Sequence, residues 1–175
     1  RKKKSIWKLW NICKFVREML RAKNIIYGYC LRTTPNKYKY LISIYRSDEL
    51  NIVAVFPTSQ KRSGSSSPVH GANMRDGNIV SYVFKGNVSI GYMPNSEEPF
   101  SFPLDTTIPF DYCFWNDSQE DILKKFRNPE IVGILSDKEY IDLVYAFLKS
   151  PLTPNRYRPI MDKILKEYLD NGCDT

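Results

Sequence analysis

The chain has 175 residues, and its hydrophobic content of 42% is enough for one ordinary domain with one core. Its formal net charge of +7 predicts a surface that binds anions: nucleic acid, an acidic membrane or an acidic polypeptide. Four dispersed cysteines and a single histidine argue against a Cys/His metal site, so neither a metal nor a cofactor is predicted.

Residues 1–24 predict an amphipathic helix with a strongly basic polar face. Such a helix can seal the core, lie on an anionic membrane or flank a nucleic-acid groove, and core packing is the favoured interpretation. No apolar run approaches the ~20 residues that a transmembrane helix needs, so a cytoplasmic location is predicted and membrane attachment is disfavoured. The apolar stripe consists of Ile6, Leu9 or Trp10, Cys13, Val16 and Leu20.

Three short runs rich in β-branched and aromatic residues follow, and each is bounded by a polar turn. They predict strands at Ile25–Leu31, Tyr40–Tyr45 and Ile52–Pro57. Residues 59–78 are poor in apolar side chains and rich in serine and glycine, which predicts a long mobile loop. Within that loop, fast hydrogen exchange is expected over residues 61–78.

Further strands are expected after this loop. Residues 79–86 and 88–93 predict a hairpin, and residues 101–115 predict one more extended segment. A short helix ending at Phe126 can be capped by Asp117 or Ser118.

The C-terminal part predicts two longer helices. Ser136 and Glu139 have the spacing of a capping box at the start of a helix that ends before Pro151. Pro159 is suited to begin the last helix, and Gly172 to end it. The residues expected to face inward from that helix are Met161, Ile164, Leu165 and Tyr168.

These elements predict an α+β fold: a small curved antiparallel β-barrel-like sheet with an added N-terminal helix and two to three C-terminal helices. No internal repeat is visible, so residues 1–175 are predicted to form a single domain. Its parts are the basic helix (1–24), the barrel core (25–150) and a C-terminal helical extension (151–175).

The end of the third predicted strand changes abruptly from apolar to polar and basic residues. Thr58, Ser59 and Gln60 are followed directly by Lys61 and Arg62. The hydroxyls can bind a phosphate, or they can simply cap backbone groups. The two cations would then contact further phosphates, or form a solvated charged pair.

His70 is the one side chain whose ordinary pKa lies near neutrality, so it is a candidate general base or acid. Its glycine-containing flexible surroundings argue against the fixed geometry that catalysis needs. Asp105 and Asp111 can take part in proton transfer, although acids beside a strand are usually turn residues.

Three motifs in this order resemble the MazF/PemK family of toxin endoribonucleases. The strand ending Pro57-Thr58-Ser59-Gln60 is similar to the family's threonine-rich strand end. The segment from Asp105 to Asp111, DTTIPFD, resembles the acidic pattern before the last strand. The sequence VGILS at residues 132–136, followed by an amphipathic helix, resembles the family's closing helix. The resemblance covers roughly residues 25–150.

The resemblance implies a type II toxin of the mRNA interferase kind, which cleaves single-stranded RNA without a metal. It further implies a homodimer with RNA across the interface, and a partner antitoxin with an acidic segment that folds over the basic groove. In such cleavage the ribose 2′-hydroxyl attacks the neighbouring phosphorus, which requires a cation and hydroxyl donors near the phosphoryl oxygens.

The family carries an arginine just before the second strand, and Lys39 stands at the matching position here. Lysine supplies the charge but not the planar bidentate contact of arginine, for which Arg32 in the same turn can compensate. The resemblance thus implies Lys39, Thr58 and Ser59 as catalytic residues. The expected RNA-binding residues are Arg32, Lys37, Gln60, Lys61, Arg62, His70 and Arg75.

Two other functions remain open at the level of sequence. The first is a catalytically silent relative that binds nucleic acid or protein through the same barrel. An arginine at position 39 would have favoured the enzyme, and the lysine leaves this alternative open. The second is an unrelated basic adaptor whose first helix attaches to anionic lipid.

Overall fold

The computed structural model describes residues 17–47 and 51–172, which contain ten strands, three α-helices and one short 3-10 helix. The strands are β1 (Asn24–Cys30), β2 (Lys37–Arg46), β3 (Asn51–Val55), β4 (Gly71–Arg75), β5 (Asn78–Phe84), β6 (Gly91–Tyr92), β7 (Pro99–Phe100), β8 (Thr106–Pro109), β9 (Phe114–Ser118) and β10 (Phe126–Leu135). The helices are α2 (Gln119–Lys124), α3 (Asp137–Lys149), η1 (Asn155–Tyr157) and α4 (Arg158–Gly172).

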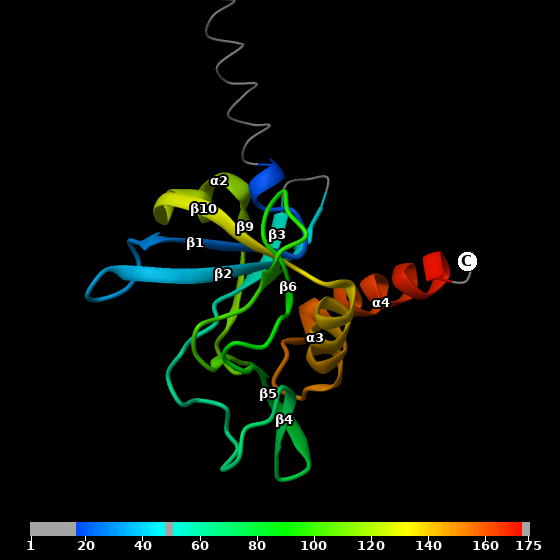
Figure 1. Cartoon of the computed structure of the whole chain (residues 1–175). Coiled ribbons are helices and arrows are strands. Elements are labelled where there is room, and N and C mark those ends of the chain that lie inside the picture. Colours follow the sequence, from blue (N-terminus) through cyan, green and yellow to red (C-terminus); the bar gives the residue numbers. More distant parts are fainter. Residues whose placement is uncertain (1–16, 48–50, 173–175) are drawn as a thin grey trace, which may run out of the picture.

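The strands form two antiparallel sheets (Figure 1). The larger sheet has the order β7-β6-β10-β1-β2-β3-β9, and the smaller has the order β4-β5-β8. A single antiparallel bridge between Thr58 and Thr107 connects them. The predicted α+β class with a curved antiparallel sheet is therefore confirmed, but among the described strands the two sheets do not close into a barrel.

The larger sheet is packed on both faces. Neighbouring residues of a strand point to opposite sides of the sheet, and in the central strands both sets of side chains are buried. Ile25 of β1 and Ile42 of β2 belong to the main core, whereas their neighbours Ile26 and Leu41 belong to a second apolar cluster. That second cluster also contains Leu20, which precedes β1, and Ile122 of helix α2. This face of the sheet is therefore covered by helix α2 and by the segment that precedes β1.

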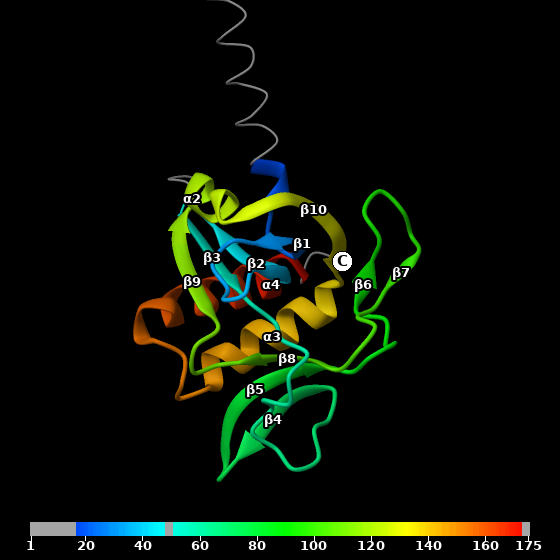
Figure 2. The ribbon, with the colours of Figure 1, turned by 90° about the vertical axis from the view of Figure 1, so that its left-hand side faces the viewer.

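Helix α3 lies between the two sheets, as Figure 2 shows. Its apolar side chains Leu143, Val144 and Phe147 are completely buried in the main core. The Tyr140 hydroxyl donates to the backbone carbonyl of Ile44 in β2 at 2.7 Å, while the other side of α3 packs on β4 and β5. The main core is thus the layer that joins the larger sheet, the helices and the smaller sheet.

The predicted pairing of residues 79–86 with residues 88–93 is wrong. Strand β5 pairs with β4 and β8, whereas β6 pairs with β10 and β7. The predicted loop 59–78 is also corrected, because its residues 71–75 form β4. This strand escaped prediction because Asn73 is its one buried residue, so no apolar alternation marks it. The extended segment 101–115 is divided into β8 and the start of β9.

The helix boundaries agree closely with the predicted caps. Ser118 caps α2 by accepting from the backbone N–H of Asp121, and Ser136 caps α3 by accepting from that of Glu139. Met161 and Ile164 face inward from α4 as expected, but Tyr168 is 43% exposed, which corrects its predicted inward position.

Most of the predicted N-terminal helix, residues 1–16, lies outside the described residues. Residues 17–19 are helical and Leu20, the last member of the predicted apolar stripe, is fully buried. Among the described helices none is both long enough and apolar enough to span a bilayer.

A buried hydrogen-bonded network joins α3 to the smaller sheet. The Glu139 carboxylate, 7% exposed, accepts from the Tyr82 hydroxyl at 2.9 Å and lies 2.9 Å from Nε2 of His70. The backbone N–H of Lys85 donates to Nδ1 of His70 at 3.2 Å, so a ring that carries its hydrogen on Nε2 satisfies both of its contacts. Burial, followed by the neighbouring carboxylate, raises the pKa of Tyr82, which keeps it a neutral donor.

We expect Tyr82→Phe to lower the free energy of unfolding by about 1–3 kcal/mol, because one oxygen of the buried carboxylate loses its donor. Urea denaturation followed by circular dichroism measures this change. The matched control is Tyr145→Phe, since Tyr145 is 51% exposed on α3 and its hydroxyl removal should change the value by no more than about 0.5 kcal/mol. Equal effects of the two substitutions would contradict a stabilising role for the network.

Candidate functional site

The candidate site begins where β2 extends beyond its neighbour β3. Pairing between these strands ends at Ile42 and Val55, whereas pairing of β2 with β1 continues to Lys37. After Val55 the chain leaves β2: Phe56 donates to the Cys113 carbonyl and Thr58 pairs with Thr107 of the smaller sheet. One edge of β2 therefore faces an irregular segment instead of a strand.

Two adjoining cavities of about 350 and 320 Å³ lie along this edge, and we call them together the basic groove. Both are lined by Lys37, Lys39, Thr58 and Gln60, and the smaller one also by Arg62. Ser59 also lines the larger cavity, so six of the predicted site residues, from the two segments 37–39 and 58–62, meet at one surface.

Thr58 has a structural contact in addition to its position in the groove. Its backbone N–H and carbonyl pair with Thr107 at 2.7 Å each, and its Oγ1 accepts from the backbone N–H of Gln60 at 3.3 Å. The hydroxyl therefore caps the strand end, as one interpretation of the sequence expected. A hydroxyl that accepts one hydrogen bond retains its O–H as a donor, so the same group can also donate a hydrogen bond to an anion in the groove.

Arg62 is fixed at the groove by a residue that the sequence did not indicate. Its Nη1 lies 2.5 Å from the Tyr112 hydroxyl, and its guanidinium lies 5.3 Å from the centroid of the Tyr112 ring. Tyr112 itself lines the smaller cavity. An arginine that lies over an aromatic ring and donates to its hydroxyl has a limited set of orientations, which favours binding of an anion in a defined position.

The cations of the basic groove perturb one another. The pKa of Lys39 is lowered, first by burial of its ammonium group and then by the charges of Lys37 and Arg62. Binding of an anion reduces the repulsion between these positive charges. The groove is thus electrostatically suited to a phosphate or another compact anion.

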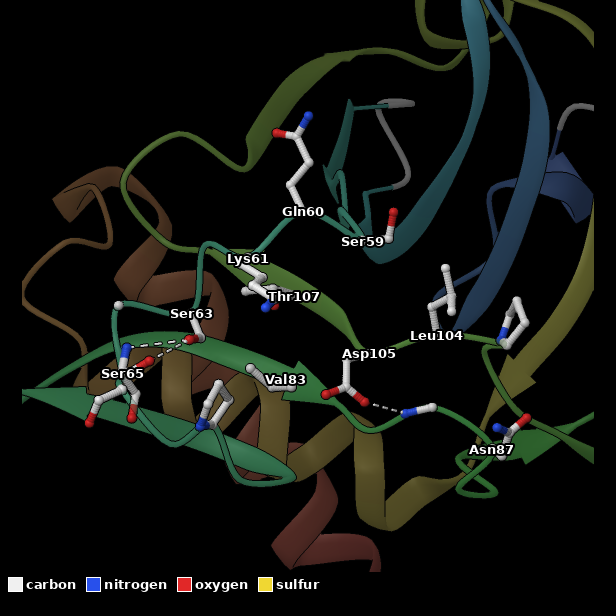
Figure 3. Close-up of a pocket in the computed structure, with 15 residues that line it drawn as sticks. Ser59, Gln60, Lys61, Ser63, Ser65, Val83, Asn87, Leu104, Asp105 and Thr107 are labelled. Carbon is white, nitrogen blue, oxygen red and sulfur yellow. Dashed lines mark hydrogen bonds between the residues drawn. The ribbon is translucent and has the colours of Figure 1, made fainter.

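The largest cavity, about 880 Å³, adjoins the basic groove through Ser59, Gln60 and Leu104. Figure 3 shows its hydroxyl-rich wall, with Ser63 and Ser65 joined by hydrogen bonds, on the opposite side from Asp105. We call it the serine-rich cavity.

Asp105 is the carboxylate of the serine-rich cavity. It accepts from the backbone N–H of Gly86 at 2.9 Å and forms an ion pair with Lys85. The Gly86 bond, followed by the Lys85 side chain, lowers the pKa of Asp105, so at neutral pH it is an anion and not a proton donor. It lies beside the basic groove and does not line it.

Of the remaining predicted residues, Ser59 lines the basic groove, whereas Arg32, Lys61, His70 and Arg75 do not. Ser59 lines both the larger cavity of the groove and the serine-rich cavity, whereas Lys61 lines the serine-rich cavity alone. Arg32 lies exposed in the turn between β1 and β2, and Arg75 lies exposed at the end of β4. His70 lies against Glu139 of α3 with both ring nitrogens engaged, so it is not part of the groove.

Three tyrosines in the groove wall were missed by sequence reasoning: Tyr27, Tyr38 and Tyr40. The available signal was the alternation of tyrosine along both strands, at positions 27 and 29 and at positions 38 and 40. Aromatic residues are common in strands for packing reasons alone, so the pattern did not indicate a site.

The chain matches no protein-family model, no curated protein and no solved structure. Within residues 17–47 and 51–172, no cluster of three or more histidine, cysteine, aspartate or glutamate side chains is arranged to hold a metal ion. The chemistry of the site therefore has to be argued from its own geometry.

At an alkaline pH that is still below the ordinary lysine pKa, we expect the protein to take up protons when it binds inorganic polyphosphate. Lys39 is partly deprotonated there because its pKa is lowered, and a bound anion restores the charged form. Isothermal titration calorimetry in two buffers of different ionisation enthalpy measures the protons taken up.

Lys39→Met should abolish this uptake. The matched control is Lys166→Met on α4, where the lysine is paired with Asp162 and its pKa is raised, so uptake should remain. Unchanged uptake in the Lys39 variant would show that another group titrates.

Proposed function

We propose that the basic groove binds single-stranded RNA and cleaves it by attack of a ribose 2′-hydroxyl on the adjacent phosphate. The observation that carries this proposal is the convergence of Lys37, Lys39 and Arg62 with Thr58 and Gln60 along one edge of β2. The net charge of +7 supports a polyanionic ligand. The groove lies on an open strand edge, which suits an extended single strand better than a rigid duplex.

In this mechanism the 2′-oxygen forms a bond to phosphorus while the bond from phosphorus to the 5′-oxygen breaks. A proton leaves the 2′-hydroxyl and one is delivered to the departing 5′-oxygen, so the products are a 2′,3′-cyclic phosphate and a 5′-hydroxyl. Lys39 and the Thr58 hydroxyl would contact the phosphoryl oxygens that carry the developing charge.

The mutual repulsion of the groove cations favours the transition state over the bound substrate. A phosphodiester carries one negative charge, and the pentacoordinate phosphoryl group formed during attack carries more. Burial lowers the pKa of Lys39 first, and the charges of Lys37 and Arg62 lower it further, so the additional negative charge stabilises the charged groove more than the substrate does. Stabilisation that increases on going to the transition state accelerates the chemical step.

A second function, RNA binding without cleavage, is favoured by a specific observation. The described residues that line the basic groove include no carboxylate and no imidazole to accept the 2′-hydroxyl proton. A lysine of lowered pKa can accept a proton, but only in its neutral form, in which it no longer stabilises charge. Lys39 also stands where the MazF/PemK family has arginine.

The toxin interpretation adds a protein partner to the same surface. An acidic, extended antitoxin segment would occupy the basic groove in place of RNA, with its carboxylates near Lys37, Lys39 and Arg62. A homodimer that continues the RNA path across its two-fold axis also belongs to this proposal.

The test is incubation of the purified chain with single-stranded RNA in excess chelator, followed by analysis of the product ends. We expect 2′,3′-cyclic phosphate ends. Thr58→Val keeps the branched shape and removes the hydroxyl, so cleavage should slow by about 10- to 1000-fold while RNA binding changes little. Lys39→Ala should slow cleavage further.

Two control variants separate chemistry from binding. Lys61→Ala should mainly weaken binding and reduce its salt dependence, because Lys61 lies in the adjoining cavity. Lys166→Ala removes the same charge from the distant helix α4 and should change neither property. Tight RNA binding without cyclic phosphate ends would establish the silent binder, and parental cleavage by Thr58→Val would remove that hydroxyl from the mechanism.

A further inference from the structure

Four tyrosines lie on one face of the ribbon formed by β1 and β2. Tyr27 is directly opposite Tyr40 in the strand register, and Tyr29 is directly opposite Tyr38. The centroid of the Tyr27 ring lies 5.2 Å from that of Tyr38 and 4.6 Å from that of Tyr40. The centroids of the Tyr29 and Tyr38 rings lie 5.4 Å apart. The four rings therefore form a continuous set, which we call the tyrosine ladder.

The tyrosine ladder extends the core face of the sheet beyond the core. Ile25 and Ile42, on the same face as Tyr27 and Tyr40, are fully buried, but the ribbon then projects away from α3 and α4 (Figure 1). Tyr38 is 59% exposed as a result. Tyr27, Tyr29 and Tyr40 are half-buried, so the ladder presents one exposed ring beside three partly covered ones. A ligand that stacks on these rings removes apolar surface from water, so this face is suited to binding.

Positive charge surrounds the tyrosine ladder. The Arg127 guanidinium lies 5.7 Å from the centroid of Tyr29, at the outer end of the ribbon. Along the open edge of β2, Tyr27, Tyr38 and Tyr40 line the same cavity as Lys37 and Lys39. Lysine and tyrosine alternate along β2, so stacking surfaces and phosphate-binding groups are adjacent at the strand edge.

We propose that the tyrosine ladder stacks with the bases of the single-stranded RNA whose phosphates occupy the basic groove. Base stacking on aromatic side chains does not depend strongly on sequence, since every base has a flat face. The charges beside the ladder match a phosphodiester backbone and not a neutral apolar partner. This inference rests on the proposed binding of RNA but not on its cleavage.

The test compares two probes of equal length and backbone charge by fluorescence anisotropy. One is a short 2′-O-methyl oligoadenylate, which cannot be cleaved by 2′-hydroxyl attack, and the other is its abasic counterpart. Tyr38→Leu should weaken binding of the oligoadenylate by about 5- to 100-fold, the value of one lost stacking contact. Binding of the abasic probe should change less than about twofold, because the phosphate contacts remain.

Two further variants make the comparison specific. Tyr38→Phe keeps the ring and should retain oligoadenylate binding. Tyr145→Leu removes an equally exposed tyrosine on α3, with the ammonium of Lys149 5.4 Å from its ring centroid, and should leave both probes unaffected.

Equal loss for both probes, or no loss for either, would overturn the stacking role. Sedimentation of the free protein gives one more outcome: if Tyr38→Leu converts a dimer into a monomer, the ladder is an interface between two copies, and the proposal fails. Base-dependent binding without cyclic phosphate products in the cleavage assay would support the ladder and remove the nuclease proposal, so the two can fail separately.

Discussion

The pair of backbone hydrogen bonds between Thr58 and Thr107 is the contact on which the candidate site depends. It draws the chain away from β2 directly after β3 and attaches it to the smaller sheet. Pro57, which has no N–H to donate, lies buried at the point where the strand pairing ends. A continued β3 would have paired with the edge of β2 along residues 37–41 and filled the space of the basic groove.

Electrostatic repulsion in the groove is tolerated because the fold is stabilised elsewhere. Lys37, Lys39 and Arg62 approach one another at the edge of β2, whereas most of the large buried side chains lie in the core around α3. Local features that oppose stability are typical of functional sites, where the surrounding structure compensates for them. The lowered pKa of Lys39 reflects first the burial of its ammonium group and then the charges of Lys37 and Arg62.

The network of His70, Glu139 and Tyr82 shows how a candidate catalytic group can instead serve the fold. The sequence presented a lone histidine in a polar segment and a glutamate at the third position of a helix, the usual place for a capping box. The structure turns the Glu139 side chain away from the helix start toward β5, where it meets Tyr82 and His70. Ser136 still caps the helix alone, and its own backbone N–H donates to Ile90.

The sequence by itself determined the elements with strong periodicity or clear caps: the first three strands, the caps Ser118 and Ser136, and the apolar faces of α3 and α4. It also indicated Thr58, Gln60 and Arg62, because a basic and hydroxyl-rich strand end is visible locally, whereas Lys39 was indicated by the family resemblance alone. Only the tertiary structure decided which strands pair, since periodicity defines the faces of a strand but not its neighbours. For the same reason β4, the partners of His70 and Arg62, and the alignment of the four tyrosines on one open face became visible only when residues distant in the sequence were brought into contact.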